Sequence, residues 1–328
     1  MSKKILVTGG AGFIGSHLCE KLLENDYNVI CVDSFNDYYD PRIKGDNIAD
    51  SLKNKNFTLV RGDILDKECL DSIFSKYDIH KVVHLAAIAG VRSSLINPQE
   101  YIDVDIKGTV NLLEIVKKYK VDQFIFGSSS SVYGINYKIP FAEEDRIDLQ
   151  ISPYATAKKC AELYCATYHY LYRIPVTILR FFTVYGPRQR PDMAIYKFTK
   201  LMSQGESISM FGDGKSERDY TYIDDIVDGI IKAIQKNFKF EIFNLGNSKT
   251  IKLRKLIELI AQRLNTDVKI QPFPEQAGDV YITYADISRA KRMLGYEPLT
   301  SVEKGIENFV KWYLKKRNFL EKLEKGDL

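Results

Sequence analysis

The chain has 328 residues, and its 47 basic and 43 acidic residues give a formal net charge of +4 at pH 7. The basic residues are scattered along the chain, which argues against a nucleic-acid-binding protein. Five cysteines without C-x-x-C spacing and four unclustered histidines predict neither a disulfide framework nor a metal site, and favour a reducing cytoplasm. No signal-peptide pattern and no apolar run of membrane-spanning length is present, so no membrane association is expected.

The first half of the chain alternates short β-branched runs with helical patterns. Strands are predicted at Lys4–Thr8, Asn28–Asp33, Phe57–Arg61, Lys81–His84 and Gln123–Ser128. Helices are predicted between them at Gly15–Glu24, Lys67–Ser75 and Val104–Tyr119. Near-continuous apolar strands that alternate with helices form a parallel sheet covered on both faces. Because the crossovers are right-handed, the fold class is predicted as α/β, a doubly wound Rossmann-type sheet.

After about Gly186 the alternation is interrupted by proline and glycine residues. The patterns predict helices at Asp224–Gln235, Ile251–Leu264 and Val302–Lys316, strands at Glu241–Gly246 and Val268–Pro272, and a solvated, fraying helix over Lys315–Leu328. We therefore predict a Rossmann domain over residues 1–186, to which residues 220–246 return. A smaller α/β domain over residues 187–328 would complete an active site at the seam.

A glycine-rich turn follows the first predicted strand. The sequence TGGAGFIG contains Gly9, Gly12 and Gly15 at the start of the first predicted helix. Glycines at these positions permit close approach of the backbone to a pyrophosphate, and the N–H groups of the helix N-terminus face its negative charge. The turn lies in the strand–turn–helix context that the motif requires, so it predicts a dinucleotide-binding site.

Two aspartates end the next predicted strands. Asp33 follows Gly15 by 18 residues and is placed to bind the adenosine ribose hydroxyls. A carboxylate at this position would repel a 2′-phosphate, which favours NAD over NADP. Asp63 ends the third strand, where an adenine contact and a solvated surface carboxylate are equally good interpretations.

A tyrosine, a lysine and a run of serines indicate the chemistry. Tyr154 and Lys158 are four residues apart on a helix that begins at Ser152-Pro153, so they share one face. A tyrosine is a poor base at neutral pH, but an ammonium group and an oxidised nicotinamide favour its phenolate. The run Ser128–Ser131 follows a predicted strand at the edge of the sheet where ligands bind. A serine hydroxyl there could orient the reacting oxygen while the tyrosine moves a proton.

These motifs resemble the extended short-chain dehydrogenase/reductase family, and within it the nucleotide-sugar epimerases and dehydratases. The resemblance covers nearly the whole chain through TGGAGFIGSHL, HLAA, SSSSVYG, SPYATAK and RDYTYIDDIVDGI. The segments VDSFNDYYDP, HLAAIAGVRSSL and YGPRQRPDMAIYKFTK resemble the UDP-glucuronate 4-epimerases most closely.

The resemblance implies NAD-dependent 4-epimerisation of UDP-glucuronate to UDP-galacturonate through a transient 4-keto sugar. It also implies a homodimer formed by the helices near Val104–Tyr119 and Tyr154–Tyr172. Ser129, Tyr154 and Lys158 fall on the catalytic positions. The positions implied to contact the cofactor are Gly9, Gly12, Phe13, Ile14, Gly15, Asp33, Phe35, Asn36, Asp63, Ile64, Leu85, Ala86, Ala87, Tyr154 and Lys158. The positions implied to contact the UDP-sugar are Ser128, Ser129, Ser130, Thr183, Arg190, Arg218 and Asp279.

The substrate assignment also depends on a carboxylate. Oxidation of a glucuronate at C4 gives a β-keto acid that readily loses carbon dioxide, so an epimerase must hold the carboxylate out of alignment with the ketone. The resemblance places Thr183 and Arg190 at that carboxylate, and an arginine fork binds both oxygens with defined geometry. Related decarboxylases and 4,6-dehydratases carry acidic residues where this chain has Ser130 and Ser131, which argues against both chemistries.

Two departures from the family pattern leave alternatives open. Asp105 stands where the family often has asparagine, and Arg188-Gln189 replaces a common Trp-Gly pair. If Arg190 is only a solvated loop residue, UDP-glucose or UDP-N-acetylglucosamine becomes the expected substrate. A non-catalytic NAD-dependent regulator is a further alternative, but it would have no use for a complete serine, tyrosine and lysine set.

Overall fold

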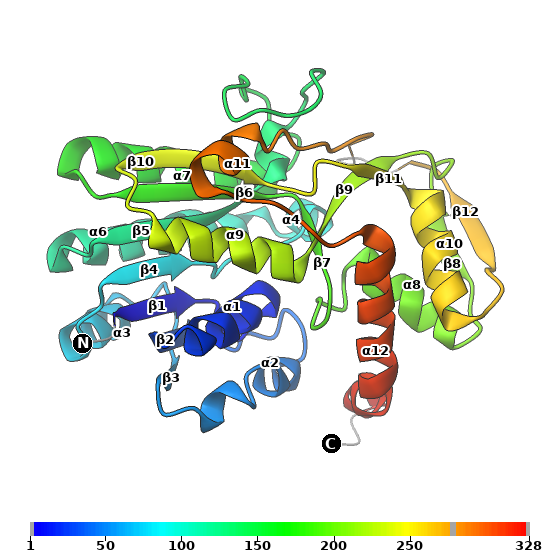
Figure 1. Cartoon of the computed structure of the whole chain (residues 1–328), viewed down its shortest axis with the longest axis horizontal. Helices are drawn as coiled ribbons and strands as arrows, with labels where there is room; N and C mark the ends of the chain where they lie inside the picture. The colour runs from blue at the N-terminus through cyan, green and yellow to red at the C-terminus, as the bar shows by residue number, and fades with distance from the viewer. Residues whose placement is uncertain (1–2, 276–279, 326–328) are drawn as a thin grey trace.

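The computed structural model describes residues 3–275 and 280–325. Its largest element is a sheet of seven strands in the order β10-β6-β5-β4-β1-β2-β3, all of which pair in parallel (Figure 1). The strands are β1 (Lys4–Thr8), β2 (Asn28–Asp33), β3 (Phe57–Arg61), β4 (Lys81–His84), β5 (Gln123–Ser129), β6 (Val176–Phe181) and β10 (Phe240–Leu245). The strand order reverses beside β1, which is the topology of a doubly wound sheet.

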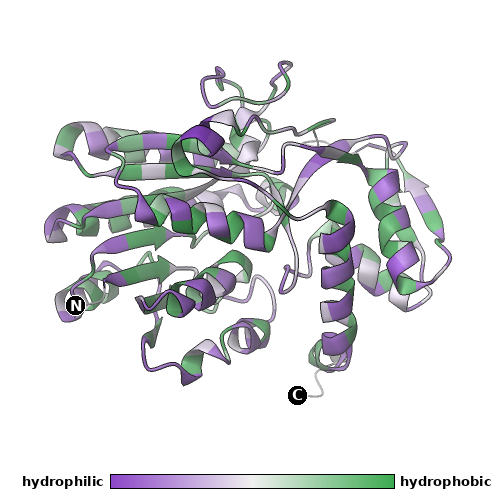
Figure 2. Ribbon diagram, viewed as in Figure 1, coloured by the Kyte–Doolittle hydropathy of each residue, from purple (hydrophilic) through white to green (hydrophobic). Residues whose placement is uncertain are grey.

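Helices cover both faces of this sheet and form a separate apolar core with each (Figures 1 and 2). Ile5 and Val7 of β1 belong to the core under one helical layer, and Leu6 belongs to the other, because successive strand side chains point to opposite faces. The first layer contains α1 (Phe13–Glu24) and α9 (Ile223–Gln235). The second contains α3 (Lys67–Lys76), α6 (Thr109–Tyr119) and α7 (Pro153–Tyr172). The predicted doubly wound α/β fold is confirmed.

A smaller α/β unit extends from one end of the sheet (Figure 1). Its strands form a three-stranded sheet in the order β11-β9-β7 and the pair β12-β8. They are β7 (Thr183–Tyr185), β8 (Ile208–Phe211), β9 (Glu217–Tyr222), β11 (Thr250–Lys252) and β12 (Ile270–Phe273). The helices in this half of the chain are α8 (Ala194–Ser203), α10 (Leu253–Leu264), α11 (Ser288–Leu294) and α12 (Val302–Lys325).

Short helices lie in the connections between the strands of the large sheet. They are α2 (Pro41–Asn47), α4 (Val91–Ile96), α5 (Pro98–Tyr101) and the 3₁₀ helices η1 (Ser51–Lys53) and η3 (Ser130–Tyr133). The segment predicted as a helix over 104–119 begins instead with a π-helix, η2 (Ile102–Gly108), which passes into α6. Gly108 packs closely here, since a Cβ on it would lie 2.5 Å from the Cδ1 atom of Ile64. A π-turn widens the helix locally and is frequent at functional sites.

The C-terminal helix is less solvated than the sequence predicts. Helix α12 continues to Lys325, and Leu320 and Leu323 are buried. Lys316 pairs with Asp46 of α2 at 2.7 Å, and Arg42 donates a hydrogen bond to the Leu323 carbonyl. The helix is confirmed as far as residue 325, but the prediction that it is solvated was wrong at Leu320 and Leu323, because tertiary contacts with α2 hold a segment whose composition resembles a solvated helix. In the described ranges, no helix has the length and apolar character needed to cross a bilayer.

Candidate active site

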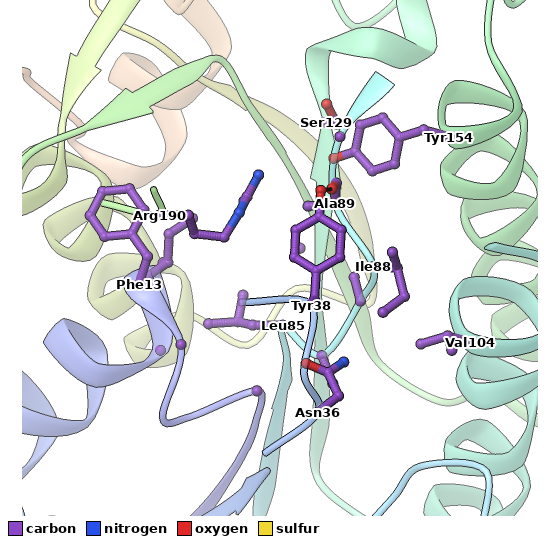
Figure 3. Close-up of a pocket in the computed structure, with 18 of the residues that line it drawn as sticks. Phe13, Asn36, Tyr38, Leu85, Ile88, Ala89, Val104, Ser129, Tyr154 and Arg190 are labelled. Carbon is purple, nitrogen blue, oxygen red and sulfur yellow. Dashed lines mark hydrogen bonds between the residues drawn. The ribbon is translucent and has the colours of Figure 1, made fainter. Parts of the chain in front are cut away.

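A cavity of about 770 Å³ opens at the carboxyl ends of β1, β2, β4 and β5 (Figure 3). Doubly wound sheets bind ligands at this edge, outside the reversal of strand order. Most of the predicted site residues line the cavity together. These are Gly9, Gly12, Phe13, Ile14, Gly15, Asp33, Asn36, Asp63, Ile64, Leu85, Ala86, Ala87, Ser128, Ser129, Ser130, Tyr154, Lys158, Thr183 and Arg190.

The glycine-rich turn leaves no room for side chains. Gly9 has φ +67°, and a Cβ on it would lie 2.8 Å from the backbone nitrogen of Ala86. A Cβ on Gly15 would lie 2.2 Å from the Gly9 carbonyl oxygen. The N-terminus of α1 therefore meets the cavity through bare backbone. Its N–H groups and its positive dipole end suit a pyrophosphate, as the motif predicts.

Asp33 is buried at the end of β2 and has several hydrogen-bond donors. Its carboxylate accepts from the Ala11 N–H at 3.1 Å and from the Phe35 N–H at 2.9 Å. The buried Lys44 of α2 lies 3.2 Å from its Oδ1 atom and also donates to Asn36 at 2.9 Å. Lys44 offsets the charge of Asp33, so the repulsion expected toward a 2′-phosphate is weaker than the carboxylate alone would produce.

Phe35 is the predicted cofactor residue that the structure turns away from the cavity. Its φ is +52°, and the Arg61 guanidinium lies 4.6 Å from the centre of its ring. Its backbone N–H supports Asp33, so its contribution to the site is indirect. Sequence reasoning missed Lys44, Tyr38 and Tyr39, which line the cavity. The segment NDYYDP, on which part of the resemblance depends, was the available signal for the two tyrosines.

Ser129, Tyr154 and Lys158 come together at the junction of β5 and α7. Ser152 caps α7 by accepting a hydrogen bond from the Ala155 N–H at 3.1 Å, so the helix begins where the sequence predicts. Tyr154 and Lys158 lie in its first turns, and the buried Lys158 ammonium donates to the Gly127 carbonyl at 3.3 Å. Figure 3 shows the side chains of Ser129 and Tyr154 on the same side of the cavity.

The serine run divides into different environments. The Ser128 hydroxyl donates to the Glu162 carboxylate at 2.7 Å, and Arg180 makes two further hydrogen bonds to Glu162 at 2.9 and 2.8 Å. This buried network holds α7 against β5 and β6, and it engages the hydroxyl predicted to contact substrate. The Ser129 hydroxyl contacts only Ser131 among the described residues, so it can rotate toward a ligand in the cavity.

His84 packs beside this group and is neutral. Burial, with the positive charge of Lys158 as a smaller cause, lowers the pKa of His84 to about 3. Its ring nitrogens lie 2.7 Å from the Thr8 hydroxyl and 3.0 Å from the Thr109 hydroxyl. Both nitrogens are occupied by these structural contacts, which agrees with a packing residue.

Thr183 begins β7 and lines the cavity, and the loop after this strand brings Arg190 to the side opposite Ser129 and Tyr154. The Arg190 guanidinium enters the cavity facing Ser129 and Tyr154 in Figure 3. It makes two hydrogen bonds of 2.9 Å to Asp192, and Tyr38 lies beneath it with 5.8 Å to the ring centre. Arg190 is therefore positioned in the site, but two of its guanidinium N–H groups already donate hydrogen bonds to the neighbouring Asp192 carboxylate.

Arg218 lies in an adjoining hollow of about 130 Å³ that shares Ser130, Ser131 and Thr183 with the main cavity. It donates to the Glu217 and Tyr281 carbonyls at 2.9 and 3.2 Å. This hollow continues the cavity toward the smaller unit. Asp279, the remaining predicted substrate residue, is outside the described residues.

Comparison with known proteins identifies the family. Residues 6–309 match the family described as GDP-mannose 4,6 dehydratase. The chain belongs to this family. It is 43% identical over 308 residues to a UDP-glucuronate 4-epimerase of Thermodesulfobacterium geofontis, and the match covers 94% of this chain and 95% of the relative. The predicted resemblance to the short-chain dehydrogenase/reductase nucleotide-sugar epimerases is confirmed.

Solved structures agree with the sequence relatives. A UDP-glucuronic acid 4-epimerase of Bacillus cereus, in complex with UDP-glucuronic acid and NAD, superimposes with a TM-score of 0.91 at 39% identity. The match covers 95% of this chain and 99% of that one. A UDP-glucose 4-epimerase of Thermotoga maritima with UDP-glucose gives a TM-score of 0.88 at 37% identity, with 96% and 99% coverage. The fold alone therefore does not separate an acidic from a neutral sugar substrate.

Proposed function

We propose that the protein is an NAD-dependent epimerase that interconverts UDP-glucuronate and UDP-galacturonate at C4. The observation that carries this proposal is the placement of Ser129 and Tyr154 on one side of the cavity and Arg190 on the other, with Lys158 lining the cavity one turn after Tyr154 on α7. A tyrosine base suits oxidation of a sugar hydroxyl, and an arginine suits a sugar carboxylate. The relatives from Thermodesulfobacterium geofontis and Bacillus cereus bear the same activity in their names.

The residues present fit the cofactor that this chemistry requires. The turn at Gly9 and Gly15 admits a pyrophosphate where side chains would clash, and Asp33 offers carboxylate oxygens for ribose hydroxyls. Leu85, Ala86 and Ala87 would border the rest of the dinucleotide. When bound there, NAD would supply the two-electron acceptor and donor for the C4 hydride.

The protein's own groups handle the proton. Tyr154, as the phenolate, removes the proton of the sugar 4-hydroxyl, and the Lys158 ammonium stabilises that phenolate. The Ser129 hydroxyl, whose hydrogen bonds in the described structure are to Ser131, rotates to donate a hydrogen bond to the reacting oxygen and orients it. The same tyrosine returns the proton after the keto sugar has turned over, since the reverse step needs an acid at the same atom.

Arg190 and Thr183 hold the substrate carboxylate. Fixing both oxygens keeps the carbon–carbon bond to the carboxylate out of alignment with the C4 ketone, which suppresses loss of carbon dioxide. At positions 130 and 131 this chain has serines, so neither position offers an acidic side chain that could deliver a proton to a decarboxylated or dehydrated product. Epimerisation is then the reaction that the site favours.

A neutral UDP-sugar is the second candidate. It is favoured by the two hydrogen bonds between Arg190 and Asp192, which occupy part of the fork that would bind a carboxylate. It is also compatible with the similarity to the Thermotoga maritima UDP-glucose 4-epimerase.

A product assay separates the two candidates. Purified protein would receive UDP-glucuronate, UDP-glucose or UDP-N-acetylglucosamine in separate reactions, with products resolved by NMR and released carbon dioxide measured. We expect UDP-galacturonate to form fastest, without carbon dioxide. Faster epimerisation of a neutral sugar would contradict the proposed role of Arg190 and leave the epimerase chemistry in place.

We also propose that the enzyme is cytoplasmic and forms a homodimer, with α6 and α7 at the interface between the two copies. Leu163, Tyr164 and Leu171 are exposed on α7, and an apolar surface of this kind favours pairing with a second copy. Analytical ultracentrifugation is expected to give a dimer, and Leu163→Glu is expected to shift it toward monomer.

We further propose residues 1–186 with 220–246 as the cofactor domain and 187–328 as the substrate domain, since β10 belongs to the large sheet and α9 packs against it.

A further inference from the structure

We propose that Asp105 is a positioning residue for Lys158, and that its carboxylate is the lysine's counter-ion and controls the pH range in which Tyr154 can act as a base. The inference rests on the proposed function only for the roles of Tyr154 and Lys158. It concerns a residue that is neither in the glycine turn nor in the serine, tyrosine and lysine set.

The π-helix η2 brings Asp105 to the lysine. Asp105 is 1% exposed, and its Oδ1 atom accepts a hydrogen bond from the Ile88 N–H at 2.8 Å. Its Oδ2 atom is buried without a hydrogen-bond partner and lies 3.7 Å from the Lys158 Nζ atom. The Thr109 hydroxyl donates to the Asp105 carbonyl at 2.5 Å and secures the wide turn. One carboxylate oxygen is therefore structural, and the other faces an ammonium group.

A buried carboxylate with a purely structural role has a different environment in this protein. Asp219 of β9 is fully buried, and both of its oxygens accept hydrogen bonds. Its donors include the backbone N–H groups of Asn247, Ser248 and Ala285 at 2.7, 3.0 and 3.2 Å. Asp105 accepts one backbone hydrogen bond at Oδ1, and its Oδ2 atom forms an ion pair with Lys158. This asymmetry indicates a role directed at the lysine.

The groups around Asp105 make its charge responsive to pH. Burial is the largest cause that raises the pKa of Asp105 to about 6, and Lys158 opposes this rise. Glu100 of α5 adds a small repulsion, while the neighbouring Tyr101 and the neutral His84 of β4 carry no charge at neutral pH. From α7, Tyr154 packs edge-on against Tyr101 with 6.0 Å between ring centres. Lys158 is therefore the principal cation opposite the carboxylate among the described residues.

Two opposing effects on the tyrosine follow from this arrangement. The ionised carboxylate holds the Lys158 ammonium in place, but it also offsets part of the positive field that stabilises the Tyr154 phenolate. Removing the charge of Asp105 would strengthen that field. Tyr154 would then lose its proton at lower pH, and the enzyme would retain activity further into the acid range.

The test is the ionisation of Tyr154 in the NAD-bound enzyme. Tyrosinate would be followed by ultraviolet difference absorbance against Tyr154→Phe, in the wild-type chain and in Asp105→Asn. We expect Asp105→Asn to move the titration to lower pH by about one unit, since the gain or loss of one nearby charge shifts an ionisation by that order. The acid limb of the pH profile of kcat is expected to move in the same direction.

Conservative and matched variants separate charge from structure. Asp105→Glu retains the charge and is expected to keep the wild-type titration, and Asp105→Ser is a smaller neutral variant if Asp105→Asn fails to fold. Asp225 of α9 caps the Leu299 and Thr300 N–H groups at 3.0 and 3.2 Å, so Asp225→Asn is the matched control and is expected to lower stability without moving the titration. A titration in Asp105→Asn and Asp105→Ser that superimposes on wild type would overturn the inference. Because this readout needs no turnover, absence of epimerisation would count against the proposed function alone.

Discussion

The two walls of the cavity are built in different ways. On the cofactor side, Gly9 and Gly15 meet backbone atoms so closely that no other residue fits, and the buried Asp33 has donors on both oxygens. On the substrate side, Arg190 stands on a loop and pairs with Asp192 two residues away. The first wall has one geometry determined by packing. On the second wall, Arg190 can exchange Asp192 for a ligand. The specificity of this wall therefore depends on competition between the Asp192 carboxylate and a substrate carboxylate for the same guanidinium.

The largest expected effect is at Tyr154, which lies where the cofactor side and the substrate side of the cavity meet. Tyr154→Phe removes the group that exchanges the proton, and kcat is expected to fall by about 10³-fold or more, since general acid–base groups contribute on this order. NAD binding, measured by fluorescence titration, is expected to remain. Tyr170→Phe, on the exposed face of the same helix, is the control and should leave kcat unchanged. Substantial turnover by Tyr154→Phe would remove the tyrosine from the mechanism.

The next effect concerns α12, which connects the substrate side with α2 of the cofactor side. Leu320 is 4% exposed, so Leu320→Ala is expected to lower the free energy of unfolding by about 2–4 kcal/mol through lost burial and a cavity. Leu314 on the same helix is 47% exposed, and Leu314→Ala should change stability by less than about 1 kcal/mol. Chemical denaturation measures both. Equal effects would mean that the end of α12 is solvated after all.

A smaller effect tests the rigidity of the cofactor wall. Gly15→Ala would place a methyl group 2.2 Å from the Gly9 carbonyl, and we expect about 1–3 kcal/mol of lost stability together with weaker NAD binding. The matched variant is Gly45→Ala in α2, where a Cβ meets nothing within 4 Å. Gly45→Ala should leave NAD binding unchanged and stabilise the chain by up to ~1 kcal/mol. Wild-type NAD affinity in Gly15→Ala would disprove the tight turn.

The last expected effect, of similar size, concerns the substrate wall. Arg190→Ala is expected to raise the KM for UDP-glucuronate by about 10- to 100-fold, the equivalent of losing a charged hydrogen-bond pair. Neutral UDP-sugars should show a much smaller change. Arg146→Ala, at a fully exposed loop position, serves as the control. An equal rise in KM for all three sugars would assign Arg190 to a common part of the substrate.

Much of the cofactor side was predictable because its signals are local. Strands β1 to β4 have the predicted bounds, and the Gly9–Gly15 turn lies between β1 and α1 as the motif requires. The helix containing Tyr154 and Lys158 begins at its predicted cap, Ser152. Each of these features depends on residues within a few positions of one another, so periodicity and spacing are sufficient to find them.

The features that were missed depend on contacts between distant segments. Lys44 meets Asp33 only because α2 folds back over the end of β2, and Phe35 turns toward Arg61 of β3. The burial of Leu320 requires α12 to reach α2, where Lys316 pairs with Asp46 across 270 residues of sequence. Local composition carries no information about such partners.

The sequence by itself determined the doubly wound sheet, the dinucleotide turn and the identity of the residues proposed for proton transfer, because short-range patterning and backbone sterics specify them. Only the tertiary structure decided what surrounds those residues. In the folded chain Ser128 donates a hydrogen bond to Glu162, and Arg190 has a competing partner in Asp192. The π-turn brings the buried Asp105 carboxylate beside Lys158. Charges in a low-dielectric interior act through their distances to one another, and those distances exist only once the chain has folded.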